Sequence, residues 1–320
     1  MEIQAFSDEL IHYGRQEHMQ DLTILPSGTQ MEVIFSKSYL RKTYQVLTNE
    51  EAQQLITRFK FLGGMEVGER RKAQLGAVSY LLGDQLQRLR ISTVGDYQGR
   101  ESLVMRFLYP LNKEHLRYFF AEDVQQIQQT TKQRGLYLFS GPTGSGKSTL
   151  MYQLARATKG QVITIEDPVE IEEPHFLQLQ TNLKIGQDYD ELIRLSLRHR
   201  PDLLLIGEIR NKETAQAAVR AALTGHRVFA TIHARGVAET KTRLLELLGA
   251  DDLLAHALQG IVYQRLLPNE VNEPHGLLAY HFYEGQVEKQ WQHVLKRVKE
   301  SGWITDEVYE KEAPATTPCN

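Results

Sequence analysis

A glycine-rich run of nine residues constrains this chain more than any other feature of its sequence. Its members are Gly141, Pro142, Thr143, Gly144, Ser145, Gly146, Lys147, Ser148 and Thr149. They match the pattern G-x-x-x-x-G-K-[ST] at every fixed position, after an apolar run at 135–140 and before a helix predicted over 150–157. The order strand, glycine loop, helix is that of a loop whose backbone N–H groups and helix N-terminus surround a phosphate.

The pattern also gives roles to two side chains. Lys147 would reach the β- and γ-phosphates of a bound nucleotide, and the Ser148 hydroxyl would hold Mg²⁺. A chance run of glycine and serine is the alternative, but it does not explain the matching strand and helix on either side. We therefore predict a nucleotide-binding protein in which residues 141–149 form the phosphate-binding loop.

Length, charge and cysteine content narrow the class of protein further. At 320 residues the chain is long enough for two domains. The net charge of -3 and the isoelectric point near 6.4 argue against a broad nucleic-acid-binding surface. The single cysteine, Cys319, excludes an internal disulfide and a cysteine-rich zinc site, and is typical of a cytoplasmic protein. No apolar run is long enough to span a membrane.

The first hundred or so residues read as a compact α+β unit. Helices are predicted over 3–20 and from 48 to 62, the second beginning at Thr48 as N-cap. Antiparallel strands are predicted over 21–28, 31–35, 77–82, 87–93 and 101–107. We place this N-terminal domain at residues 1–108, followed by a linker at 109–121.

Beyond Leu136 strands and helices alternate, which predicts an α/β domain with a parallel sheet covered on both faces. The short apolar runs lie at 162–165, 202–206 and 227–232, with helical sequence such as 214–223 between them. Residues 240–267 are predicted to be helical. This second domain spans residues 122–312, with a helical part at its C-terminal end, and residues 313–320 are predicted to be a disordered tail.

Acidic residues follow two of the predicted parallel strands. Glu208 comes after the apolar run that ends at Gly207, and Glu166 and Asp167 come after 162–165. Because α/β sheets bind ligands at the carboxyl ends of their strands, these acids are placed to organise Mg²⁺ and a water that attacks phosphate. A strand-end acid is often only a solvated loop residue. The nearby glycine loop favours the catalytic interpretation.

Two histidines, His226 and His233, flank the apolar run at 227–232. A pair with this spacing could ligate a metal, but no third ligand lies nearby and the only cysteine is far away along the chain. Taken alone, the pair is best interpreted as two polar residues at the ends of a strand. We predict no zinc site.

Four segments occur in the order of four motifs of one protein family. They are Gly141–Thr149, Ile165–Glu170, Pro201–Asp202 with Gly207–Arg210, and Thr224–His226 with Thr231–His233. These resemble the Walker A, Asp, Walker B and His boxes of the secretion and type IV pilus assembly ATPases. Residues 64–71 and 89–93 are similar to the PAS-like domain that precedes the motor in that family. The resemblance covers about residues 21–268.

The resemblance implies a RecA-like P-loop ATPase core that follows a smaller N-terminal α+β, PAS-like domain. It also implies that ATP and Mg²⁺ bind between these two domains, and that six subunits form a ring. By motif match, Glu208 is the Walker B glutamate and Glu166 the acid of the Asp box. Which of the two activates water stays open. The implied catalytic residues are Lys147, Glu166, Glu208, His233, Arg90, Arg106, Arg194 and Arg198, and the implied Mg²⁺ site comprises Ser148, Glu208 and Asp167.

Departures from the family pattern indicate the type of motor. Ala234-Arg235 follows His233 where the family often has Thr-Asn, residues 74–76 lack the usual aspartate, and Arg200 stands where an acid is common. The four-cysteine motif of many extension ATPases is absent, as is the C-terminal helical motif of retraction motors between Gly276 and Gly302. The chain therefore most resembles the ATPase that drives the competence pseudopilus of Gram-positive bacteria.

That resemblance implies a cytoplasmic homo-hexamer at the inner face of the cell membrane. Its implied partners are a polytopic membrane platform protein and, indirectly, major and minor pilins, with no direct contact to nucleic acid. Alternatives are a retraction or general secretion ATPase, a nucleotide-gated regulatory protein with little turnover, and a DNA-translocating RecA-like protein. Genomic neighbourhood would distinguish a retraction or secretion ATPase from a competence ATPase. Absence of turnover would indicate the regulatory protein, and salt-dependent DNA binding would indicate the DNA-translocating protein.

Overall fold

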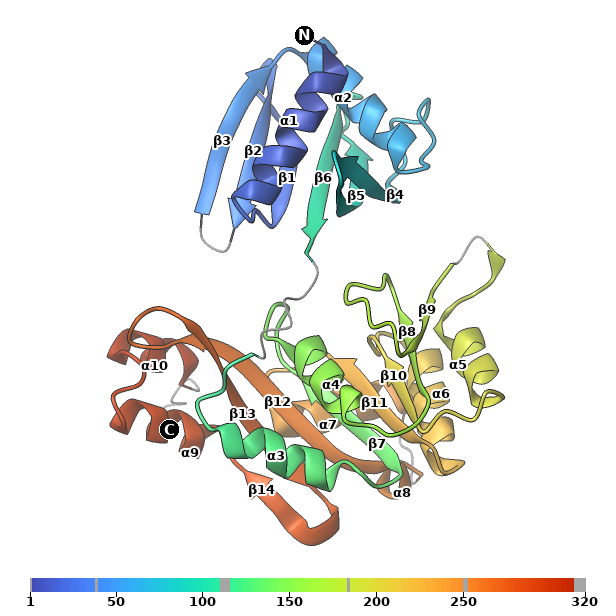
Figure 1. Cartoon of the computed structure of the whole chain (residues 1–320), viewed down its shortest axis with the longest axis vertical. Helices are drawn as coiled ribbons and strands as arrows, with labels where there is room; N and C mark the ends of the chain where they lie inside the picture. The colour runs from blue at the N-terminus through green and yellow to red at the C-terminus, as the bar shows by residue number, and fades with distance from the viewer. Residues whose placement is uncertain (1, 38–39, 110–115, 183–184, 250–252, 314–320) are drawn as a thin grey trace. The chain divides into compact units, whose positions relative to one another are not determined.

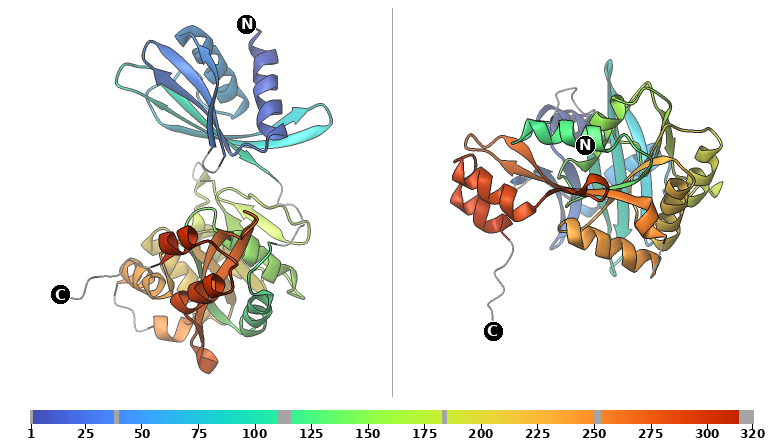
Figure 2. Two further views of the ribbon diagram at one scale, coloured as in Figure 1. Left: turned by 90° about the vertical axis from the view of Figure 1, so that its left-hand side faces the viewer. Right: turned by 90° about the horizontal axis from the view of Figure 1, so that it is seen from below.

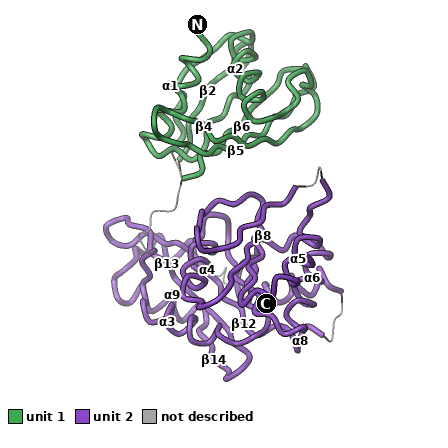
Figure 3. Tube along the Cα trace, turned by 45° about the vertical axis from the view of Figure 1, so that its right-hand side comes forward, with its two compact units in different colours: residues 1–110 green, residues 111–320 purple. Residues whose placement is uncertain are grey.

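The computed structural model describes residues 2–37, 40–109, 116–182, 185–249 and 253–313, and the chain forms two compact units, residues 1–110 and 111–320 (Figures 1 and 3). The predicted disordered tail, apart from Ala313, lies outside the described residues, as does Cys319. Among the described residues, no helix is both long and apolar enough to cross a bilayer.

The first unit is a six-stranded sheet with two helices on one face (Figure 2). The strand order is β3-β2-β1-β6-β5-β4, and all neighbouring strands pair antiparallel. This confirms the predicted α+β class, with one strand, β3, that was not predicted. The elements are α1 (Ile3–Gln16), β1 (Asp21–Ser27), β2 (Gln30–Lys37), β3 (Leu40–Leu47), α2 (Asn49–Leu62), β4 (Gln74–Leu82), β5 (Gln85–Gly95) and β6 (Glu101–Leu108).

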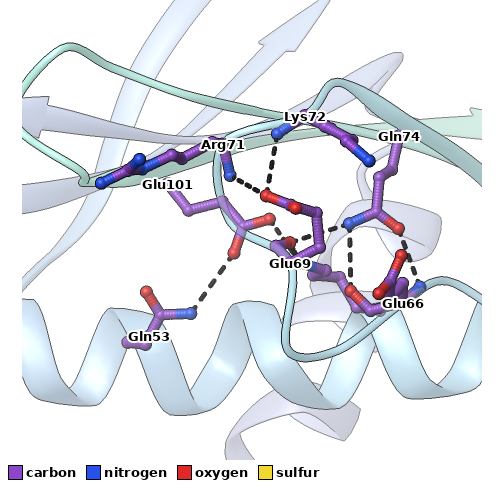
Figure 4. Close-up of polar contacts among 8 residues, drawn as sticks. Gln53, Glu66, Glu69, Arg71, Lys72, Gln74 and Glu101 are labelled. Atoms are coloured by element: carbon purple, nitrogen blue, oxygen red, sulfur yellow. Dashed lines mark hydrogen bonds and ion pairs between the residues drawn. The ribbon is translucent and has the colours of Figure 1, made fainter.

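Helix α2 carries a buried cation into the core of this unit. The helix begins at Thr48, the predicted N-cap, which forms a capping box with Glu51. Near its end, Lys60 is fully buried and its Nζ lies 2.7 Å from Glu101 Oε1 and 2.5 Å from the Glu69 carbonyl oxygen. Gln53 also donates to Glu101, at 3.3 Å (Figure 4). The ion pair therefore ties α2, β6 and the loop between α2 and β4 together.

We expect Lys60→Met to destabilise the first unit by about 3–5 kcal/mol, because the substitution leaves the buried Glu101 carboxylate without its cation. Hydrogen exchange of the α2 and β6 backbone amides in the whole chain measures this opening free energy. The double substitution Lys60→Met with Glu101→Leu should recover most of the loss, since it removes both charges. Wild-type exchange rates in Lys60→Met would contradict the account.

The second unit is built on an eight-stranded sheet of order β14-β13-β12-β7-β11-β10-β8-β9. Neighbouring strands from β12 to β9 pair parallel, and β13 and β14 are added antiparallel at one edge. The strands are β7 (Gly135–Ser140), β8 (Val162–Glu166), β9 (Leu177–Gln180), β10 (Leu203–Ile206), β11 (Arg227–Ile232), β12 (Leu258–Pro268), β13 (Pro274–Phe282) and β14 (Val287–Lys289).

Helices cover both faces of this sheet, as predicted for an α/β domain (Figure 1). One face packs against α3 and α4, the other against α5 to α8, and α9 packs beside β13 in a smaller core. The helices are α3 (Ala121–Thr130), α4 (Lys147–Arg156), α5 (Tyr189–Leu197), α6 (Lys212–Leu223), α7 (Val237–Leu248), α8 (Leu254–Ala257), α9 (Trp291–Glu300) and α10 (Asp306–Glu312).

The prediction of helix throughout 240–267 is wrong for its last part. Helix α7 ends at Leu248, and from Leu258 the chain forms the long strand β12 beside β7. Residues 260–263 are buried on both faces of the sheet. A strand buried on both faces has a continuous apolar sequence, which hydrophobic periodicity alone does not separate from a buried helix.

The predicted linker at 109–121 lies only partly within the described residues, because 110–115 fall outside them. Tyr118 forms a β-bridge with Gly276, and Phe120 is buried in the core that contains α9. The last residues of the predicted linker are therefore packed into the second unit.

Candidate nucleotide-binding site

The glycine loop joins the end of β7 to the start of α4. Gly141, Gly144 and Gly146 have φ angles of +141°, +75° and +84°, which side-chain-bearing residues rarely adopt. A Cβ on Gly141 would lie 2.3 Å from the Gln264 carbonyl oxygen, and one on Gly146 would lie 2.7 Å from Gln264 Nε2. The N-cap residue of α4 is Gly146, which has no side chain to cap the first backbone N–H groups, so these can bind a ligand. The loop geometry is that of an anion cradle.

Lys147 is the first residue of α4 and is folded back onto the loop. Its Nζ donates to the carbonyl oxygens of Gly141 and Pro142, at 2.9 and 2.8 Å. Burial lowers the pKa of Lys147 to about 8, opposed by the negative charge of Glu208. The loop therefore holds a poorly solvated ammonium group whose present partners are neutral carbonyls.

Glu208, in the loop after β10, is near enough to Lys147 for its negative charge to act on the pKa of the lysine. Its carboxylate accepts a hydrogen bond from Arg210 Nε at 2.5 Å and lies 3.2 Å from His233 Nε2. The other ring nitrogen of His233, Nδ1, lies 3.2 Å from the Gly141 carbonyl oxygen. His233 thus bridges the acid and the glycine loop. The structure brings together Lys147, Glu208 and His233, three of the predicted catalytic residues.

Glu166, at the end of β8, is buried and faces α4. Its Oε1 accepts hydrogen bonds from the Tyr152 hydroxyl at 2.6 Å, from the Thr164 hydroxyl at 2.7 Å and from Gln178 Nε2 at 3.5 Å. Burial raises the pKa of Glu166, although these three donors oppose the shift. A carboxylate with a raised pKa is a better proton acceptor than an exposed one.

The predicted acids gather at one edge of the sheet around Tyr189, the first residue of α5. Burial raises the pKa of Tyr189, and the charges of Asp167, Glu166 and Glu208 raise it further while Arg210 lowers it. Asp167 Oδ2 also lies 3.9 Å from Arg210 Nη1. The carboxyl ends of the parallel strands therefore bring the acids to a common edge, as the sequence predicts.

The four predicted arginines belong to two parts of the chain, β5 and β6 of the first unit and α5 of the second. Arg90 and Arg106 face each other on β5 and β6 of the first unit, where Arg106 pairs with Asp21 at 2.8 Å. On α5, Arg194 pairs with Glu191, and Arg198 is exposed at the helix end. Neither α5 arginine forms a hydrogen bond or ion pair with the glycine loop within the described ranges. Their catalytic roles, and the binding of ATP between the two units, stay predictions.

The predicted Mg²⁺ ligands are Ser148, exposed in the first turn of α4, and the carboxylates Glu208 and Asp167. Ser148 follows Lys147 directly, so a cation bound there would lie next to the phosphates that Lys147 contacts. In the described part of the chain, no group of three or more His, Cys, Asp or Glu side chains is placed to hold a metal ion.

Sequence reasoning missed four polar residues of the site: Arg210, Tyr152, Gln178 and Gln264. Arg210 lies two positions after Glu208, and Tyr152 lies one helical turn after Ser148, so their spacing could have identified them. Gln178 and Gln264 reach the site from β9 and β12, strands that were not predicted. No local pattern marks Gln178.

Residues 2–302 match the family model described as type II/IV secretion system protein. The chain belongs to this family. Among its relatives, the competence protein ComGA of Streptococcus pneumoniae is 43% identical over 307 residues, which cover 95% of this chain and 96% of that protein. The competence protein ComGA of Bacillus subtilis is 36% identical over 251 residues, covering 76% of this chain and 70% of that protein.

Solved structures show the same fold. The X-ray structure of the Legionella pneumophila ATPase DotB superposes with a TM-score of 0.74 at 21% identity, over 96% of this chain and 95% of that one. At this identity the likeness concerns the fold alone. Together with the family match, it confirms the predicted RecA-like α/β core with a smaller N-terminal α+β unit.

In this type II/IV secretion system protein, nucleotide affinity should depend on pH through Lys147. Below about pH 8 the ammonium is charged, and above it the free protein must take up a proton to grip a phosphate. We expect the dissociation constant of a Mg²⁺-bound, non-hydrolysable ATP analogue to rise by up to about tenfold per pH unit above pH 8. Lys296→Met, an exposed lysine on α9, should keep this slope. A constant affinity from pH 7 to 9.5 would rule out this role for Lys147.

Proposed function

We propose that this chain is a Mg²⁺-dependent ATPase that hydrolyses ATP to ADP and phosphate and converts the energy into mechanical work. One observation carries the proposal. Lys147 contacts the Gly141 carbonyl of a loop whose glycines at 141 and 146 leave no room for a side chain, and His233 joins Glu208 to the same carbonyl. This combination positions a cation and an acid at a phosphate cradle.

The residues present fit a nucleoside triphosphate with Mg²⁺. The loop offers uncapped helix N–H groups to phosphate oxygens, and Lys147 can exchange two neutral carbonyl partners for anionic ones. Ser148 and the carboxylates of Glu208 and Asp167 would hold the Mg²⁺, which when bound neutralises charge on the phosphates. All these groups are hard oxygen ligands, the type that Mg²⁺ prefers.

We assign different tasks to Glu208 and Glu166, the acids of the Walker B and Asp boxes. Arg210 and His233 hold the Glu208 carboxylate in a fixed orientation, which suits a group that positions Mg²⁺ or a water molecule. Glu166 is buried, and its raised pKa makes it the stronger candidate to accept the proton of the attacking water. Tyr152 orients Glu166 from α4, the helix that also carries Lys147 and Ser148.

The cellular role that we propose is to drive the assembly of a competence pseudopilus for uptake of transforming DNA. The ComGA relatives support this role, since the pneumococcal protein matches this chain over nearly its full length. In this role the chain forms a cytoplasmic hexamer at the inner face of the membrane. It acts on a membrane platform protein, and through it on pilins, by closing and opening its two units in each catalytic cycle.

Substitutions of the two best-placed residues test the chemistry. Lys147→Ala should abolish nucleotide binding and turnover together. Glu208→Gln should keep nucleotide binding but lower turnover by about 10²–10³-fold, as expected when one charged group is removed from a reacting centre. Glu246→Gln, an exposed acid on α7, is the matched control and should hydrolyse ATP at the wild-type rate. Steady-state phosphate release and equilibrium binding measure the two effects.

Wild-type turnover by Glu208→Gln would overturn the assignment of Glu208. Tight ATP binding without any turnover by the wild-type protein would favour a nucleotide-gated regulator instead. Measuring turnover per chain against protein concentration tests the assembly: a steep rise supports a ring whose sites need neighbouring subunits, and a constant value contradicts it.

A further inference from the structure

Buried polar groups without partners gather beside the glycine loop. Both side-chain amide atoms of Gln264, on β12, and the Ser145 hydroxyl, in the loop, make no hydrogen bond within the described residues. Gln264 is 1% exposed and Ser145 is 3% exposed. Leaving such groups unpaired in a protein interior costs free energy, so their presence calls for a physical reason.

The two groups lie against the glycines that shape the cradle. Gln264 Nε2 is 2.7 Å from the position that a Cβ on Gly146 would take, and Ser145 Oγ is 2.7 Å from the corresponding position on Gly141. Tyr118 joins them, because its buried hydroxyl lies beside the Gln264 side chain but forms no hydrogen bond of good geometry in the described part of the chain. Amide and hydroxyl groups can all donate hydrogen bonds.

The loop also has acceptors that depend on Lys147. The carbonyl oxygens of Gly141 and Pro142 both accept from its Nζ. When Lys147 turns to a phosphate, as the proposed function requires, both carbonyls lose that donor. Unpaired donors on Gln264, Ser145 and Tyr118 lie around the same loop. Donors without partners therefore lie around a loop in which two carbonyls each lose one contact when nucleotide binds, while Gly141 keeps His233 Nδ1 and Pro142 keeps the Ser145 N–H.

We propose that Gln264 is a positioning residue of the nucleotide site. When Lys147 leaves the Gly141 and Pro142 carbonyls for the phosphates, the Gln264 amide and the hydroxyls of Ser145 and Tyr118 donate hydrogen bonds to the glycine loop. The inference rests on the proposed function, since it requires a triphosphate in the loop. Unpaired donors destabilise the protein without nucleotide and strengthen nucleotide binding once they are paired.

The substitution Gln264→Met tests this inference, because it keeps an unbranched side chain of similar length and removes the donors and the acceptor. Without nucleotide, its melting temperature should equal or exceed that of the wild type, since a buried unpaired amide is gone. Its affinity for a Mg²⁺-bound, non-hydrolysable ATP analogue should fall about tenfold, equivalent to one or two lost hydrogen bonds. A merely structural glutamine would produce a lower melting temperature instead.

Gln259→Met is the matched control. Gln259 lies on the same strand β12, but its side chain is beside Gly135, at the opposite end of β7 from the glycine loop. We expect this variant to bind the analogue as the wild type does. Tyr118→Phe, which removes only the hydroxyl, should keep the melting temperature and weaken binding by a few-fold.

The possible outcomes separate the inference from the proposed function. If the wild type does not bind the analogue, the proposed function fails and the inference fails with it. If the wild type binds and Gln264→Met binds equally well, the inference alone is wrong. A large loss of melting temperature, or failure to fold, in Gln264→Met would show that the amide is already paired, for example by buried water, and would also overturn the inference.

Discussion

The site depends on one ammonium group placed inside a glycine loop. Lys147 has little access to water, and its Nζ is held by the Gly141 and Pro142 carbonyl oxygens, so burial lowers its pKa to about 8. Neutral carbonyls compensate a buried charge less well than phosphate oxygens do. The loop is therefore arranged so that an anion relieves an unfavourable state of the free protein. Glycines at 141 and 146 are required because the backbone and side chain of Gln264 fill the space on the other side.

The parallel sheet brings the remaining groups to this lysine. Strands β7, β8, β10 and β11 run in the same direction, so the residues that follow them emerge at one edge. Their side chains are then oriented by contacts across the sheet: His233 bridges Glu208 and the Gly141 carbonyl, and Tyr152 holds Glu166. The surroundings of the two acids differ. Glu208 is held by the nitrogens of Arg210 and His233, whereas Glu166 is buried and held by neutral donors. This difference is the physical basis for giving them different tasks.

Sequence reasoning predicted the groups that belong to short motifs at strand ends. The glycine loop, Glu208 and His233 lie close together as expected, because the residues that follow neighbouring parallel strands emerge at the same edge of the sheet. Residues 258–267 were wrongly predicted as helix because a strand buried on both faces has no period of two. With β12 misassigned, Gln264 could not be placed against the loop. Gln178 was missed for a similar reason, since nothing near it in the sequence shows that β9 lies beside β8. Pairing between distant segments is the information that local patterns lack.

The most direct test of the account is an experimental structure of the protein with Mg²⁺ and a non-hydrolysable ATP analogue. The account predicts that Lys147 Nζ leaves the Gly141 and Pro142 carbonyl oxygens and contacts the β- and γ-phosphates, with Glu208 facing the Mg²⁺. A structure in which the triphosphate binds elsewhere, or in which Lys147 keeps its two carbonyl partners while the analogue occupies the loop, would contradict it.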